Sequence, residues 1–125
     1  MSLARDLRTA LAASLPSTWR VTGFVPVGTR IDRTTVGAWT TDIAHLEGAP
    51  NGHYVQSASV ALYTPYQDPE KADDALDADL EVLLDALWQV PDVMFDGGQR
   101  TATNDQTMHA WILTVRQGIT ITQED

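Results

Sequence analysis

The chain of 125 residues is long enough for one domain, spanning residues 1–125, with its own hydrophobic core. It contains no cysteine, which excludes disulfides, thiol nucleophiles and thiolate metal ligands. The net charge of -9 rests on residues 68–96, which hold ten acids and one lysine, while the charges elsewhere cancel. Because phosphate contacts need Lys and Arg, this acidic segment is not expected to bind nucleic acid. No signal peptide or membrane span is predicted, and synthesis in a cytosol is expected.

The first half of the chain predicts a helix followed by strands. Leucines recur every four residues from Leu3 to Leu15, which predicts a short amphipathic helix that Ser2 caps and Pro16 ends. Alternating and β-branched residues then predict strands between turn signals. The expected elements are an edge strand over 19–27, a turn over 28–33, a strand over 34–44, a turn over 47–53 with Asn51-Gly52, and a central strand over 54–64.

A second helix is the clearest element of the sequence. Asp68 is a good N-cap, Pro69 fits the first helical position, and the helical pattern continues to about Trp88, before Pro91. Leucines and alanines cover one broad arc, which is expected to face a sheet. Acidic residues form the opposite face: Glu70, Asp74, Asp77, Glu81 and Asp85.

The last third of the chain predicts further strands. Two short strands are expected over 92–95 and 100–103, separated by an Asp96-Gly97-Gly98 turn, then a turn at 104–105 and a long strand over 108–122 with a bulge or bend at Gly118. The stretch from 54 to 93 suits a right-handed crossover. The sequence therefore predicts an α+β fold, with a mixed, mainly antiparallel sheet of four to five strands and two helices packed on one face.

No residue pattern points to catalysis. His45, His53 and His109 lack the three- or four-residue spacing that places metal ligands on one helix face. No Gly-x-Ser-x-Gly elbow occurs, and the helical carboxylates follow one solvated stripe instead of converging as a catalytic pair. We therefore expect no enzyme activity, no metal and no cofactor.

Two residues break the pattern of the second helix. Asp79 falls within the apolar arc, so it either tips into solvent or meets an arginine, which another subunit could supply. Trp88 projects in line with the acidic stripe. The following Gln89-Val90-Pro91 segment is expected to cover it, and the alternative is a contact surface, since tryptophan is enriched at interfaces.

Three segments resemble the tail terminator proteins of long-tailed, siphovirus-type bacteriophages. Residues 62–77 read Leu-Tyr-Thr-Pro-Tyr-Gln-Asp-Pro and continue into an acidic helix with a Leu-Asp-x-x-Leu rhythm. The first helix leads into Leu15-Pro16 and then Trp19-Arg20-Val21, and Arg100 precedes a closing strand over 110–115. The similarity follows the order of elements over most of the chain and is weakest over 28–53.

This resemblance implies a structural virion protein without cofactor or membrane contact. It implies a homo-oligomeric ring, usually a hexamer, that caps the completed tail tube, joins the tail to the head-tail connector and lets DNA pass without binding it. Such a protein lies at the head-proximal end of the tail and is assembled in the host cytoplasm.

Physical reasoning supplies the interface candidates, because a ring subunit needs two different surfaces that meet head to tail. The candidates are Arg30, Arg33, Trp39, Asp79, Trp88 and Arg100, with the three arginines expected in loops and complementary to the acidic face. Another head–tail completion protein is the nearest alternative. A small ligand-binding domain or enzyme would instead need a concave pocket with convergent polar groups.

Overall fold

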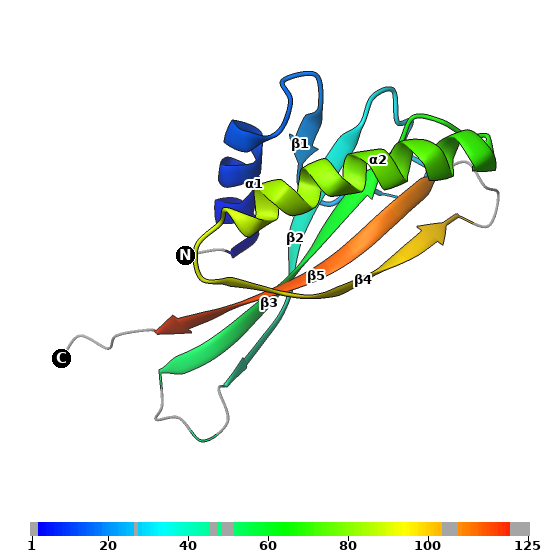
Figure 1. Cartoon of the computed structure of the whole chain (residues 1–125). Helices are drawn as coiled ribbons and strands as arrows, with labels where there is room; N and C mark the ends of the chain where they lie inside the picture. The colour runs from blue at the N-terminus through cyan, green and yellow to red at the C-terminus, as the bar shows by residue number, and fades with distance from the viewer. Residues whose placement is uncertain (1–2, 27, 46–47, 49–51, 104–107, 121–125) are drawn as a thin grey trace.

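The computed structural model describes residues 3–26, 28–45, 48, 52–103 and 108–120 (Figure 1). The predicted Ser2 cap, the 104–105 turn and most of the predicted 47–53 turn lie outside these ranges. The elements are α1 (Leu3–Ser14), β1 (Arg20–Thr22), β2 (Thr35–His45), β3 (His53–Tyr63), α2 (Pro69–Trp88), β4 (Val93–Ala102) and β5 (His109–Thr120).

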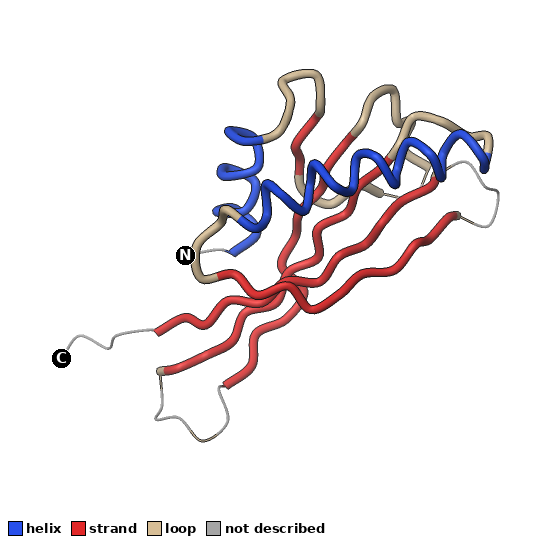
Figure 2. Tube along the Cα trace, in the orientation of Figure 1, coloured by secondary structure: helices blue, strands red, loops and turns tan. Residues whose placement is uncertain are grey.

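The strands form one mixed sheet in the order β1-β2-β3-β5-β4. β1 pairs with β2 in parallel, and every other neighbouring pair is antiparallel. Both helices pack on the same face of this sheet (Figures 1 and 2). The predicted α+β fold class is therefore confirmed. The crossover joins β3 through α2 to β4, which runs parallel to β3 with β5 between them.

The start of α2 follows the predicted cap chemistry. The side chain of Asp68 accepts a hydrogen bond from the backbone N–H of Lys71 at 3.3 Å, and Pro69 occupies the first helical position. This arrangement satisfies one of the N–H groups that a helix start leaves without a partner. At the other end, the N–H of Gln89 reaches back to the carbonyl of Ala86.

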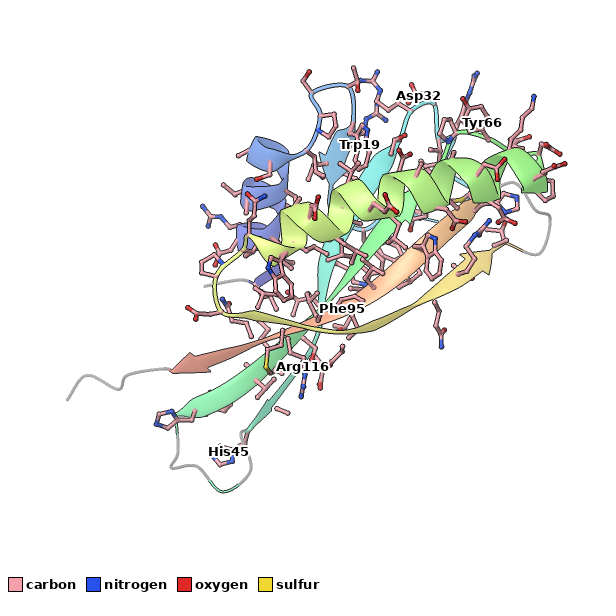
Figure 3. All side chains as sticks on the ribbon, viewed as in Figure 1. Trp19, Asp32, His45, Tyr66, Phe95 and Arg116 are labelled. Carbon is pink, nitrogen blue, oxygen red and sulfur yellow. The ribbon has the colours of Figure 1, made fainter. Side chains whose placement is uncertain are left out.

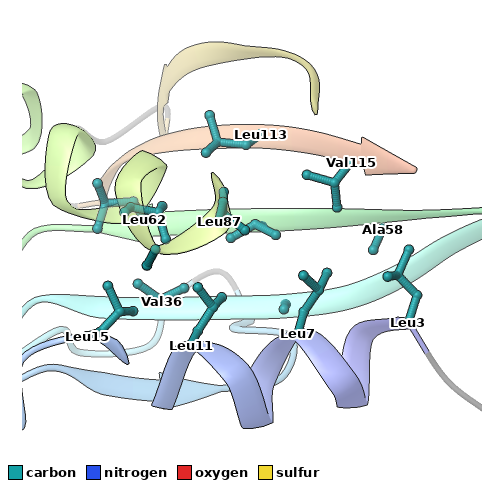
Figure 4. Close-up of a cluster of buried hydrophobic side chains, with 14 of the residues drawn as sticks. Leu3, Leu7, Leu11, Leu15, Val36, Ala58, Leu62, Leu87, Leu113 and Val115 are labelled. Atoms are coloured by element: carbon teal, nitrogen blue, oxygen red, sulfur yellow. The ribbon is translucent and has the colours of Figure 1, made fainter. Parts of the chain in front are cut away.

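The main core lies between the helices and the sheet (Figure 4). The four leucines of the first periodic stripe, Leu3 to Leu15, are buried against Val36 and Ala58 of the sheet. From α2, Leu76 and Leu83 enter the same core. The four-residue spacing read from the sequence therefore marks the buried face of α1.

The opposite face of the sheet carries a second, smaller apolar cluster. Val25, from the segment after β1, packs with Tyr63 and Met108, and Trp39 lies against this cluster. Burial raises the pKa of the Tyr63 phenol above its usual value. The segment after β1 thus covers part of a face that the helices leave open.

The predicted edge strand over 19–27 is shorter in the structure, because β1 ends at Thr22. A Cβ placed on Gly37 of β2 would lie 2.6 Å from the backbone oxygen of Gly23. The chain leaves the sheet here by passing directly over Gly37, a position that only glycine allows.

The predicted turn at Asp96-Gly97-Gly98 is wrong. These residues lie inside the single strand β4, which replaces the two short strands of the prediction. Asp96 is an extra residue where the register with β5 shifts, and Gly97 adopts a φ of 126°. Gly98 leaves no space for a Cβ beside Leu113. The glycines therefore serve a bulge and a close approach between strands, not a reversal of the chain.

Of the bulge or bend predicted at Gly118, the bulge is wrong, because Gly118 pairs regularly with Val55. A register shift lies instead in β2, between Thr40 and Asp42.

Candidate assembly surfaces

The acidic face of α2 is exposed along its whole length. Asp77, Glu81 and Asp85 follow one another at four-residue intervals, a spacing at which like charges repel mildly. Asp85 also lies in the last turns of the helix, where the macrodipole disfavours an anion, and no basic residue occupies the last turn. In the acidic stripe, Glu70, Asp74, Asp77, Glu81 and Asp85, the first member lies in the first turn, where the macrodipole favours an anion, whereas the last three do not stabilise the isolated helix.

Arg100 lies within β4, opposite Trp111, and not in a loop as expected. Its Nη2 lies 2.7 Å from Oδ1 of Asp73 on α2 and 3.3 Å from Nδ1 of His109. Its Nη1 donates to the carbonyl oxygen of Thr101 at 2.6 Å. Arg100 therefore uses its donors inside the chain, and we do not assign it to a subunit interface.

Asp79 is half-buried on α2 and reaches the residue that precedes β2. Its Oδ2 accepts a hydrogen bond from the hydroxyl of Thr34 at 3.2 Å. Burial raises the pKa of the Asp79 carboxyl above its usual value, and the hydrogen bond from Thr34 opposes that shift. The partner within the described chain is thus a neutral hydroxyl and not the arginine that the sequence led us to consider.

Arg30 and Arg33 lie in the exposed segment before β2. Asp32 lies between two arginines, 3.6 Å from Nε of Arg33 and 3.7 Å from Nη2 of Arg20 (Figure 3). A hollow of about 610 Å³ separates this segment from Pro65 and Gln67 and is lined by Arg30 and Asp32. Arg30 and Arg33 therefore share this end of the molecule with Arg20, and their place in a subunit contact stays a prediction.

Trp39 lies on the sheet face away from the helices. Its ring meets that of Phe24 edge to face, with centroids 5.2 Å apart. Phe24 is exposed, so this aromatic pair forms a separate apolar surface beside the smaller core cluster. The six interface candidates therefore lie on both faces of the sheet and do not form one patch.

Trp88 is 89% exposed, so the expected cover by Gln89-Val90-Pro91 is wrong. Val90 packs on the main core instead, and Pro91 helps to line a groove of about 550 Å³ beside Trp88. Leu84 of α2 and Phe95 of β4 are exposed walls of this groove. We call this feature the Trp88 groove.

The sheet has two unpaired edges among the described residues. β4 is the last strand, so its outer edge has no partner strand. At the other side, β1 pairs only with Thr35 to Gly37 of β2. Nη1 of Arg8 donates to the carbonyl of Ala38 at 2.9 Å, and beyond that point β2 continues to His45 without a strand on its outer side. Figures 1 and 2 show this part of β2 extending past the helices.

Exposed apolar side chains, which no sequence pattern identified as exposed, mark both edges. Ile43 on β2 is 52% exposed and Phe95 on β4 is 51% exposed (Figure 3 labels Phe95). The apolar run Val93-Met94-Phe95 was the available signal, but a short run does not show whether a strand is central or at an edge.

The structure does not bring the three histidines together. His45 and His53 lie at one end of the sheet, where the rings of His45 and Tyr54 meet edge to face. His109 is buried at the opposite end of β5, because His53 pairs with Thr120. Within the described ranges, no group of three or more His, Asp or Glu is placed to hold a metal ion. No described helix is long and apolar enough to span a bilayer.

Comparison with known proteins gives matches at the level of structure. No family model matches the sequence, and no curated protein matches it. A chain from the virion of a native gene transfer agent particle superposes with a TM-score of 0.64 at 15% identity, covering 96% of both chains. A chain from the sheath/tube terminator of an extracellular contractile injection system, PVC, in the extended state, gives a TM-score of 0.41 at 13% identity. That match covers 97% of this chain and 57% of the other.

The first of these matches defines a class of fold. This chain has, over 96% of its length, the α+β fold of a chain from a gene transfer agent virion.

Proposed function

We propose that this protein is a structural subunit of a phage-like tail that forms a ring capping the completed tail tube. The observation that carries the proposal is the end-to-end fold likeness to a chain of a gene transfer agent virion. The position at the head-proximal end of the tail comes from the resemblance of residues 62–77 to siphovirus tail terminators.

The distribution of charge supports a subunit that meets copies of itself. The acidic stripe covers the exposed face of α2, whereas Arg20, Arg30 and Arg33 gather beside the start of β2. Opposite charges on different surfaces of one chain favour head-to-tail contacts, which close into a ring if the rotation permits. Trp88 and Asp79 remain our candidates for that contact, with Trp39 at a second surface.

The proposed partners follow from the position of such a ring. The ring, of six copies, would sit on the tail tube protein at the head-proximal end of the tail and meet the head–tail connector. DNA would pass through its bore without specific binding, and the acidic stripe, on the bore or on the outside, offers phosphate no cation. The proposed role is structural and includes no reaction and no cofactor.

The first test measures native mass and position. Light scattering after size exclusion should give about six times the chain mass of 13.7 kDa, either alone or on addition of tail tubes. A nonsense mutation in a producing strain should give tubes of uncontrolled length that lack heads, as electron microscopy would show. A protein that stays monomeric with tubes present and is missing from purified particles would refute the proposal.

The second candidate is another head–tail completion protein, because a virion match does not give a position in the particle. Immunogold labelling separates the two roles. Label at one end of tails that lack heads supports a terminator. Label only on isolated heads supports a connector-side protein.

A further inference from the structure

The two free edges of the sheet run in opposite directions. Three antiparallel steps separate β2 from β4, through β3 and β5. When copies are related by rotation about an axis along the strands, each strand keeps its direction relative to that axis. The free edge of β2 would then meet the free edge of β4 from the next copy in antiparallel orientation, the more common way for strands to pair.

The apolar side chains on the two edges lie at nearly the same level of the sheet. The strand register joins Ile43 through Gln56 and Gln117 to Val93, two residues before Phe95. Two residues along a strand correspond to about 7 Å. A small stagger between copies therefore brings Ile43 level with Phe95.

The same two side chains lie on the same face. Phe95 pairs with Val115, which belongs to the main core under the helices. Ile43 pairs with Gln56, whose side-chain oxygen accepts a hydrogen bond from the backbone N–H of Leu3 in α1 at 2.8 Å. Both therefore project on the helix face, where the Trp88 groove opens beside Phe95.

From these relations we propose that the occupant of the Trp88 groove is Ile43 of a second copy of this chain. The free edge of β2 (Trp39 to Ala44) pairs with the first half of β4 in the next copy, so that one sheet continues into the other. Ile43 then packs against Phe95, Trp88 and Leu84 of the neighbour. This inference rests on the proposed function in that it describes how the ring is held together.

The helices leave room for this contact. α2 packs over β3 and β5, and α1 packs over β2 and its neighbours. In the joined sheet, two strand spacings, about 10 Å, separate β5 under α2 from β2 under α1 of the next copy. Packed helices lie about 8–10 Å apart, so Trp88 would lie where two helices of neighbouring copies meet, without a collision.

An unprotected edge of this kind is otherwise a liability. Proteins usually block such edges with lysine, proline or a covering segment, because a free ladder pairs with any exposed strand. Neither β2 nor β4 contains a lysine or a proline. Each strand does carry one register shift, between Thr40 and Asp42 in β2 and between Phe95 and Gly97 in β4, so the proposed pairing uses the stretches beside these shifts.

A cysteine cross-link tests the proposed pairing, since the chain has no cysteine of its own. We would combine Ile43→Cys with Phe95→Cys and oxidise the assembled protein, using purified particles if assembly needs the tail. Inside one chain the two positions are three strand spacings apart, about 14 Å, which exceeds the reach of a disulfide. The expected product is a ladder of covalent oligomers that stops at the ring size.

The single variants are the controls for that experiment. In a head-to-tail contact, neither Ile43→Cys nor Phe95→Cys can link two chains through this interface. A dimer from Phe95→Cys alone would mean that two β4 edges meet across a two-fold axis, which overturns the proposal. Absence of the ladder from the double variant overturns it as well.

A mixing experiment tests the same interface without a covalent cross-link. Ile43→Asp removes the β2 side of the contact and Phe95→Asp removes the β4 side, so each variant alone should lose the ring mass completely. An equimolar mixture should give a one-to-one dimer that grows no further, because one intact interface remains. If Phe95→Asp alters the circular dichroism spectrum, Trp88→Ala replaces it, since Trp88 is 89% exposed.

Tyr66→Asp is the matched control, because Tyr66 is 50% exposed and lies at the other end of the sheet (Figure 3). It should leave the ring mass unchanged. A mixture of the two edge variants that stays monomeric, or rings formed by either variant alone, would overturn the proposal. If the protein caps tails but the double cysteine variant gives no cross-links, this interface is rejected and the tail function stands. If cross-linked rings form but the protein is absent from particles, the interface stands and the tail function is rejected.

Discussion

The guanidinium of Arg100 on the outer strand β4 lies 2.7 Å from the carboxylate of Asp73 on α2. The same Nη2 lies 3.3 Å from Nδ1 of His109, and Nε2 of that ring lies 3.2 Å from the carbonyl oxygen of Gln67. Because Arg100 can only donate, Nδ1 must accept, and Nε2 therefore carries the hydrogen that Gln67 receives. The network ties β4 and β5 to the start of α2.

Arg100→Leu should lower the free energy of unfolding by roughly 1–3 kcal/mol, because buried acceptors lose a charged donor. Asp73→Asn should cost less than about 1 kcal/mol, since the Asp73 side chain is 62% exposed and water screens the pair. Arg100→Lys should recover only part of the loss, because one ammonium cannot replace the fork of a guanidinium. Urea denaturation measures all three, and equal losses for Arg100→Leu and Asp73→Asn would show that the ion pair alone matters.

Leu83 and Leu84 are neighbours with different surroundings. Leu83 is fully buried in the main core, whereas Leu84 is an exposed wall of the Trp88 groove. Leu83→Ala should lower the stability of the monomer by roughly 2–4 kcal/mol through lost contacts and a cavity. Leu84→Ala should change it by less than about 1 kcal/mol and weaken assembly instead. Thermal unfolding and light scattering on both variants separate the two effects.

Gly37→Ala should destabilise the chain by roughly 1–3 kcal/mol, because the new methyl group would collide with the backbone of Gly23. The strain should also loosen the segment that carries Val25 over the smaller cluster. Gly118→Ala is the matched control, since a Cβ added to Gly118 would meet nothing within 4 Å beyond its chain neighbours. That substitution should be neutral or slightly stabilising, because alanine loses less backbone entropy on folding. A neutral Gly37→Ala would contradict the close approach.

Asp79 should make stability depend on pH. Its pKa is raised by burial in the folded chain, so the folded state keeps this proton to a higher pH than the unfolded state. The Asp79 contribution to stability is therefore largest below the unfolded pKa and falls as pH rises through the folded pKa. Asp79→Asn keeps an acceptor for Thr34 and removes the buried charge.

We expect Asp79→Asn to gain stability over the wild type as pH rises from about 3 to 7. The gain should stay below about 1 kcal/mol, because the site is only half-buried and solvent screens it. Urea denaturation at both pH values checks the trend. Asp77→Asn is the control on the exposed stripe, and a gain at the acidic pH as large as at the neutral one would exclude a titration of Asp79.

Sequence patterns predicted the elements whose signal is local. The four-residue leucine spacing and the Asp68-Pro69 start identified both helices, because helix periodicity and cap chemistry act over a few neighbouring residues. Strand alternation likewise located β3 and β5. The exposed acidic stripe followed from the same helical geometry.

Local patterns failed where the outcome depended on a distant strand. Asp96-Gly97-Gly98 has the composition of a turn, but pairing with β5 holds these residues inside one strand. Nothing near Arg100 in the sequence indicates that Asp73 and His109 would occupy its donors.

The sequence by itself determined the helices, the strand faces and the concentration of negative charge, because these depend on periodicity and residue type along the chain. Only the tertiary structure decided which strands lie at the edges and which apolar side chains remain exposed there. The order of strands and the exposure of Ile43, Trp88 and Phe95 depend on contacts between segments that are far apart in the sequence. A free edge is a property of the assembled sheet, since each strand taken alone has two unpaired sides.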